Sequence, residues 1–196
     1  MQLPTSGHVY FVRVRERAVS FTAAPKILVL VRHINVCDSG GWLPGEASTT
    51  GIDEFVVRTD AQGYFTVPPR SFDEVCARVA LVPTAYAPGY KSLGARALLN
   101  NPFIKDKSAF AGLEENDAIL EPQKLSQQRA KDLAQAIHSG LGTIPMSNEI
   151  LREMAPEMSQ LAAAFPQIWL SECKQYDVCG EYPEAPISPN AQPSKR

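Results

Sequence analysis

The first 122 residues carry short apolar segments with the period of β-strands. Residues 8–15 (HVYFVRVR) alternate after an aromatic start, with valines on one face and arginines on the other. Residues 26–34 (KILVLVRHI) are apolar on both faces over most of their length, which is typical of a strand covered on both sides. Further strands are expected at residues 54–59, 64–67, 75–86, 91–98 and 117–122. Their spacing, with turn residues between them, predicts an antiparallel β-sandwich.

Two of the connections between these strands carry clear turn signals. Residues 60–63 (DAQG) begin with Asp and end with Gly, which favours a type I turn with a left-handed glycine before the return strand. Residues 87–90 (APGY) form a second turn signal. We therefore assign a structural role to four turn residues: Asp60, Gly63, Gly89 and Tyr90.

A calcium loop is the alternative interpretation of the stretch that starts at Asp60. An EF-hand loop needs Gly at its sixth position and Glu at its twelfth. Counting from Asp60, these positions hold Phe65 and Ser71, so the stretch fails at both. We expect neither a metal nor another cofactor.

After residue 122 the apolar period becomes helical. One helix is expected behind Ser126 as N-cap and ends at glycines 140 and 142; a second opens near Pro145 and is interrupted by Pro156. The apolar stripes that define these helices are Ala130, Leu133, Ala134, Ile137 and Leu141, then Leu151, Met154, Met158, Leu161 and Phe165. We expect a helical hairpin over residues 123–170, packed on the strand-rich part, with its stripes against that part or against each other and the methionine and leucine stripe as core.

Charge and hydropathy exclude several classes of partner. The net charge is −2 and the isoelectric point about 5.9, which gives no electrostatic footprint for nucleic acid. No apolar run is long enough to span a bilayer. The N-terminal sequence MQLPTSGHVYF shows no signal peptide, so we expect either a cytoplasmic chain or one whose signal, with a possible lipid anchor, is missing.

The four cysteines bear on the cellular compartment. Cys173 and Cys179 have five residues between them and lie before a proline-rich tail. A disulfide there would close a short loop in residues 171–196, a segment otherwise expected to be disordered. Cys37 and Cys76 could form a second pair, and free thiols in a reducing compartment remain the alternative. Neither spacing is that of a zinc site.

Several of these stretches together resemble a known family. The elements are VRVRERAV, the strand ILVLVR, TDAQGYFTVP at residues 59–68 and AYAPGY at residues 85–90, with DAILEP as a closing strand. They are similar to the carboxypeptidase regulatory-like domains, which show T-D-x-x-G-x-F and A-x-G-Y. Thr59, Asp60, Gly63 and Phe65 match the first motif, and Ala87, Gly89 and Tyr90 match the second.

The resemblance covers residues 7–122 and leaves the helical part unexplained. It implies a transthyretin-like β-sandwich, a fold used at the C-terminus of some zinc carboxypeptidases and widely in bacterial secreted and envelope proteins. The chain departs from the family in a long loop at residues 35–51 and an insertion between Leu99 and Leu120. Function is often grafted onto such loops.

Motifs for catalysis are absent from the sequence. The three histidines are far apart and belong to no metal-binding motif, and there is no nucleophile elbow, phosphate loop or dinucleotide fingerprint. We therefore predict no catalytic residues and no enzyme activity. Trp42 and Leu43, which follow two glycines in the long loop, are the candidate contact for a partner protein.

We expect a non-catalytic binding or structural module of the bacterial cell envelope, periplasmic or lipoprotein-like, that acts through protein–protein contacts. One alternative is a periplasmic immunity-type protein that neutralises a toxin or hydrolase. The other is a hydrolase or carbohydrate-binding protein whose site is built from loops. The sequence names neither the partner nor the oligomeric state.

Overall fold

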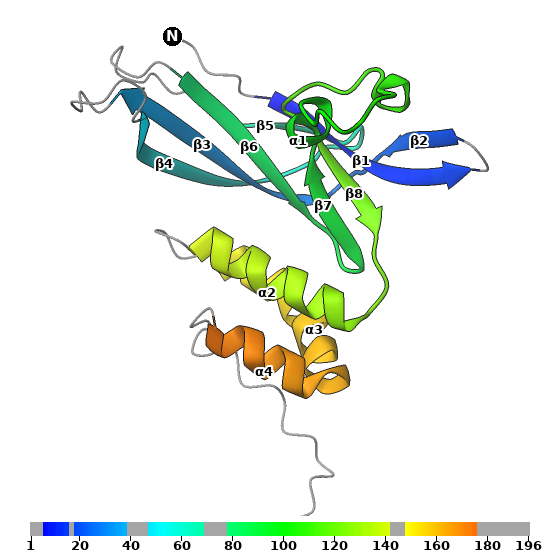
Figure 1. Ribbon diagram of the computed structural model, residues 1–196, viewed down its shortest axis with the longest axis vertical. Helices are drawn as coiled ribbons and strands as arrows, with labels where there is room; N and C mark the ends of the chain where they lie inside the picture. The colour runs from blue at the N-terminus through cyan, green and yellow to red at the C-terminus, as the bar shows by residue number, and fades with distance from the viewer. Residues whose placement is uncertain (1–5, 16–17, 39–46, 69–77, 142–147, 176–196) are drawn as a thin grey trace, which may run out of the picture. The chain divides into compact units, whose positions relative to one another are not determined.

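The computed structural model describes residues 6–15, 18–38, 47–68, 78–141 and 148–175. The chain divides into two compact units, Met1–Pro122 and Gln123–Arg196. The division falls where the hydrophobic pattern changes from the strand period to the helix period. The first unit is rich in β-strands and the second is helical (Figure 1).

In the described part of the first unit, one sheet has five strands, four of them in the order β2-β1-β8-β7, while β5 pairs with the start of β1. Their bounds are β1 Ser6–Arg15, β2 Ala18–Ala23, β5 Tyr64–Thr66, β7 Tyr90–Gly94 and β8 Ala118–Pro122. The strands β1 and β8 run parallel, so the sheet is mixed and the purely antiparallel prediction is wrong here. The intervening chain is long enough for a parallel return, which a hairpin turn cannot make.

Over the residues that the structure describes, the second sheet has three antiparallel strands in the order β4-β3-β6. Their bounds are β3 Leu28–Asp38, β4 Ala47–Arg58 and β6 Arg78–Tyr86. The central strand β3 is buried on both faces at residues 28–31, which confirms the prediction from its apolar run. Pro83 lies in β6 at the edge of this sheet, where a residue without an N–H is tolerated.

Two sequence-based assignments in this unit are wrong. The expected loop at residues 35–51 is partly strand, because β3 continues to Asp38 and β4 begins at Ala47, with Thr49 paired to Val36. The expected strand at residues 91–98 ends at Gly94 and continues as a short helix, α1 Ala95–Leu99. Its sequence ARALL is made of strong helix formers. A single 3₁₀ turn, η1 Ser108–Phe110, follows in the insertion.

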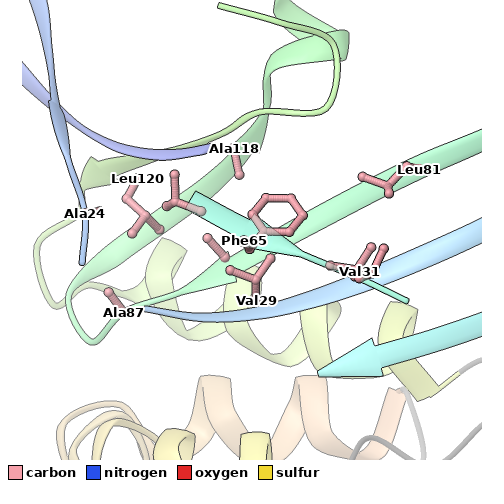
Figure 2. Packing of buried hydrophobic residues seen from close by; sticks show 11 residues of the cluster. Ala24, Val29, Val31, Phe65, Leu81, Ala87, Ala118 and Leu120 are labelled. Carbon is pink, nitrogen blue, oxygen red and sulfur yellow. The ribbon is translucent and has the colours of Figure 1, made fainter. Parts of the chain in front are cut away.

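Residues from both sheets share one hydrophobic core (Figure 2). Phe65 on β5 is 2% exposed and points in among side chains from the other strands. Its ring lies over Gly7, where a Cβ would come within 2.6 Å of the ring carbon Cζ. The buried cluster is Val9, Ala24, Val29, Val31, Phe65, Val67, Leu81, Ala85, Ala87, Ala118 and Leu120.

Within its described residues, the second unit contains three helices, not the expected two. They are α2 Gln127–Leu141, α3 Asn148–Ala164 and α4 Pro166–Gln175. The hydrogen bonds Phe165 N–H to Leu161 O (2.8 Å) and Trp169 N–H to Phe165 O (2.9 Å) carry the chain from α3 into α4. Pro166 fits the first position of α4, because a helix leaves that N–H unpaired. The expected loop from residue 171 therefore begins as helix as far as residue 175.

Six residues of the expected apolar stripes are buried, which agrees with the expectation that the stripes are core. Ala130, Leu133 and Ala134 of α2 are buried, as are Met154, Met158 and Leu161 of α3. The Oγ of Ser126 accepts the Arg129 N–H at 3.1 Å, which confirms it as the N-cap. Within the described residues, no helix combines the length and apolar character needed to cross a membrane.

A buried ion pair joins α2 to α3 in a way that the sequence did not indicate. The Arg129 guanidinium donates to both carboxylate oxygens of Glu157 at 2.8 Å, and both side chains are about 5% exposed or less. Gln123 Oε1 accepts a further N–H of Arg129 at 3.2 Å. A paired, bidentate geometry of this kind offsets the cost of burying two charges.

Removing one member of this pair should destabilise the helical unit strongly. We expect Glu157→Gln to lower the unfolding free energy by about 3–5 kcal/mol, because Arg129 keeps a buried charge without its counter-ion. The double variant Arg129→Met/Glu157→Leu buries no charge and should lose much less. Urea unfolding of the full chain, followed by helical circular dichroism, measures both. A double variant as unstable as the single one would contradict this account.

Candidate functional site

The residues of the two matched motifs lie where the chain crosses from one sheet to the other. The β2–β3 connection, the β4–β5 connection and the β6–β7 connection each join strands of different sheets. TDAQG forms the second of these corners and APGY the third. A corner needs tight backbone turns with satisfied polar groups, since the core lies directly beneath it.

Asp60 is used within its own turn. Its Oδ1 accepts the N–H of Gln62 at 2.8 Å and that of Tyr64 at 2.9 Å, while its backbone closes the turn with Tyr64 and Gly63. The carboxylate is exposed, and these bonds are those of an Asx turn. Among the described residues, no group of three or more His, Cys, Asp or Glu side chains is placed to hold a metal ion.

Thr59 joins two of the corners to each other. Its buried Oγ1 donates to Ala24 O at 2.7 Å and accepts the Ile27 N–H at 2.8 Å. Two backbone bonds, Lys26 N–H to Thr59 O and Thr59 N–H to Ile27 O, complete the junction. Lys26 takes a positive φ of 59°, so the β2–β3 corner is tightly turned. The hydroxyl thus fixes the β2–β3 corner against the β4–β5 corner.

Gly63 and Gly89 both have positive φ, but their surroundings differ. Gly63 (φ 84°) is buried, and a Cβ there would lie 2.8 Å from Val9 O and 3.0 Å from Ala24 N. Gly89 (φ 76°) is exposed, with nothing within 4 Å of a Cβ. Tyr90 N–H donates to Ala87 O at 3.1 Å to close the APGY turn. Glycine is therefore needed at position 63 for two reasons: its positive φ, and the lack of space for a Cβ.

A cluster of titratable side chains in the first unit surrounds His8 at the start of β1. His8 is 6% exposed, and its ring lies 3.9 Å from that of Tyr10 and 4.2 Å from that of Tyr64, between centroids. Its Nε2 bonds to the carbonyl oxygen of Gln62, which only accepts, so Nε2 carries the proton. Its Nδ1 is buried with no hydrogen-bond partner among the described residues.

Asp117 lies beside His8, and each of its carboxylate oxygens accepts one backbone N–H. Its Oδ1 accepts the His8 N–H and its Oδ2 accepts the Glu114 N–H, both at 2.8 Å. Burial raises the pKa of the Asp117 carboxyl above its usual 3.8, although these two bonds oppose the rise. Burial, and then the charge of Asp117, raise the pKa of Tyr10 above 10.0. Asp117 therefore fixes the first residues of β1 to the segment that precedes β8.

This cluster has acid–base groups but lacks the arrangement of a catalytic site. A nucleophile held by a base, itself oriented by a third group, is the usual signature. Here the Nε2 of His8 faces a carbonyl, and both oxygens of Asp117 accept main-chain N–H groups. The described contacts use these groups to hold turns and strand ends in place.

The other candidate residues from the sequence do not belong to the His8 cluster. Trp42 and Leu43 lie outside the described residues, as do Cys76 and Cys179. Cys37 lies on β3 and Cys173 on α4, but their side chains are not described, so neither disulfide is tested. His33 is buried on β3 with its ring 5.4 Å from that of Phe55.

Sequence reasoning missed the pairing of His8 with Asp117. The two residues are 109 positions apart and carry no shared motif. The available signal was that each lies at the N-terminal end of an expected strand, so a parallel pairing of these strands would bring them together.

Comparison with protein-family models, with curated proteins and with solved structures finds no match to this chain.

The Asp117 carboxyl should affect the free energy of unfolding and the way that this free energy changes with pH. Asp117→Asn places an NH₂ donor where the chain needs an acceptor, so we expect a loss of about 1–3 kcal/mol. Because the folded pKa is raised, the carboxyl stabilises the fold most below pH 3.8 and less as pH rises through the interval just above it. The stability difference from Asp117→Asn should therefore shrink as pH rises through that interval.

Asp106→Asn is the matched control, because the effect of Asp106 on stability should change with pH in the opposite direction. Hydrogen bonds from Ser108 lower the pKa of the exposed Asp106 carboxyl, so its stabilising effect is lost as pH falls. Urea titrations of the three chains from acid to neutral pH measure both differences. If the Asp117→Asn difference grew with pH, the folded pKa would be lowered and the account of its burial would be wrong.

Proposed function

We propose that this chain is a non-catalytic binding module of the bacterial cell envelope that acts through contacts with another protein. One observation carries the proposal: the best candidates for chemistry are occupied by the main chain of the same unit. Thr59, Asp60 and Asp117 all accept backbone N–H groups, and His8 bonds to a backbone carbonyl. These groups serve the fold, which leaves the loops as the parts that can serve a partner.

As part of this proposal, the strand-rich unit is a carboxypeptidase regulatory-like, transthyretin-like β-sandwich. Two sheets that share one core support it, as does the position of both matched motifs at corners between the sheets. Such a fold hosts many functions, so it limits the architecture and not the activity. The envelope location rests on the same resemblance and on the proposed Cys173–Cys179 disulfide.

The insertion between Leu99 and Leu120 offers a contact residue of the expected kind. Phe103 is 89% exposed, although it is a large aromatic side chain. The Oδ1 of Asn101 accepts its N–H at 2.9 Å, so a local turn fixes its backbone. A side chain this exposed adds little to the stability of its own unit. An exposed aromatic side chain is a common anchor in protein interfaces.

Photocrosslinking tests this proposal. A benzophenone amino acid placed at position 103 of the full chain, in cells that express it natively, should form one discrete adduct with a second protein. The same probe at Thr84, an exposed residue of β6, should not form that adduct.

The adduct partner is then purified and its affinity for the native chain and for Phe103→Ala is compared. We expect Phe103→Ala to weaken binding at least about tenfold, which corresponds to about 1.4 kcal/mol. The proposal fails if the adduct is the same from both positions, or if Phe103→Ala binds as tightly as the native chain.

A further inference from the structure

The hairpin of β1 and β2 extends beyond the rest of its sheet. The strand β8 pairs with residues 9–11 of β1, whereas β2 pairs with residues 10–15. Residues 12–15 and 18–21 therefore form a two-stranded segment, here called the hairpin arm (Figure 1). A two-stranded ribbon has little stability of its own in water. Pairing with a third strand would therefore stabilise the arm.

The arm has one apolar and one polar face. On the apolar face Val12 is opposite Phe21, and Val14 is opposite Val19. Phe110 of η1 lies near Phe21, with ring centroids 6.5 Å apart. Farther out, Val14 is 80% exposed and Val19 is 39% exposed. The outer half of the apolar face is thus open, although two β-branched residues lie on it.

On the polar face the side chains of β2 are small. Arg13 of β1 is exposed and lies opposite Ser20, whose Oγ donates to Arg13 O at 3.3 Å. Thr22 is the next described residue of β2 on this face. A long arginine side chain can therefore extend across β2 toward whatever lies beyond it.

The hydrogen bonds of Val9 show which backbone groups of β2 point outward. Val9 N–H donates to Gly63 O at 2.8 Å, and Val9 O accepts the Ala24 N–H at 3.0 Å, so both groups face the β2 side. Because strand backbones alternate, Arg13 also faces β2, and its partner Ser20 faces back. Val19 and Phe21 then direct their N–H and C=O groups away from β1. Within the described part of the chain, no strand pairs with β2 on that side.

We infer that the outer edge of β2 accepts an extended strand of a partner protein whose side chains alternate between apolar and acidic. The outward N–H and C=O groups of Val19 would supply main-chain hydrogen bonds. The partner's apolar side chains would pack beside Val19, and its carboxylates would meet Arg13 across Ser20. This inference rests on the proposed function in that it assumes a protein partner.

A second copy of this chain is a poorer occupant of the edge. Pairing of two β2 edges would place two basic faces in one sheet, since each copy carries Arg13 on its polar face. Basic residues near an edge strand are a common means of preventing such self-association. A strand with acidic side chains would instead be attracted to Arg13.

Binding of defined peptides to the full chain tests the inference. The probe is an acetylated and amidated peptide of four Val–Glu repeats with a fluorescent label, and the control probe has four Val–Lys repeats. Fluorescence anisotropy should show that the native chain binds the Val–Glu peptide at least about tenfold more tightly than the Val–Lys peptide.

Two variants separate the backbone contribution from the charge contribution. Val19→Pro removes the outward N–H at an edge position that tolerates proline, so the chain should stay folded and lose Val–Glu binding about tenfold or more. Val19→Thr keeps the N–H and the branched side chain and should bind nearly as the native chain does. Arg13→Glu should reverse the preference in favour of the Val–Lys peptide.

Three results would overturn the inference. The first is equal binding of both peptides by the native chain, and the second is an unchanged preference in Arg13→Glu, which does not depend on how Val19→Pro folds. The third is a dimer in sedimentation that Val19→Pro abolishes, since a second copy would then occupy the edge. None of these affects the photocrosslink at position 103, so this inference can fail while the proposed function stands.

Discussion

The strand-rich unit depends on the close approach between the corner at Gly63 and strand β1. A Cβ at Gly63 would lie 2.8 Å from Val9 O, so only glycine lets the two backbones come this near. The approach brings Val9 N–H to Gly63 O and lets β5 pair with the first residues of β1. Pairing in this register turns Phe65 into the core between the two sheets, where its ring covers Gly7.

The polar residues near this contact fix the surrounding chain. Thr59 connects the β4–β5 corner to the β2–β3 corner through its buried hydroxyl. Asp117 connects the start of β1 to the segment before β8, and His8 bonds back to the corner through Gln62. Each of these bonds satisfies a main-chain group that the core would otherwise leave unpaired. These polar groups therefore hold the corners of the unit together.

Local patterns predicted much of this, and contacts distant in sequence did not appear in them. The turn at Asp60 and Gly63, the buried strand β3 and the N-cap at Ser126 each carry their signal within a few residues. The parallel pairing of β1 with β8 carries none, because its partners are more than a hundred residues apart. The sequence does not mark Arg129 and Glu157 as a pair, since helical periodicity alone does not show that two charges meet inside a core. The cluster of His8 with Asp117 was missed for the same reason as the parallel pair.

A comparison of two glycine substitutions tests most directly whether the Gly63 contact organises the unit. Gly63→Ala and Gly89→Ala share the strain of a positive φ, about 1 kcal/mol, but only the first introduces a Cβ against backbone atoms. The unfolding free energy from urea titration should therefore fall by about 1 kcal/mol for Gly89→Ala and by about 3 kcal/mol or more for Gly63→Ala. Equal losses for the two variants would mean that Gly63 is only a turn residue, and would contradict the account.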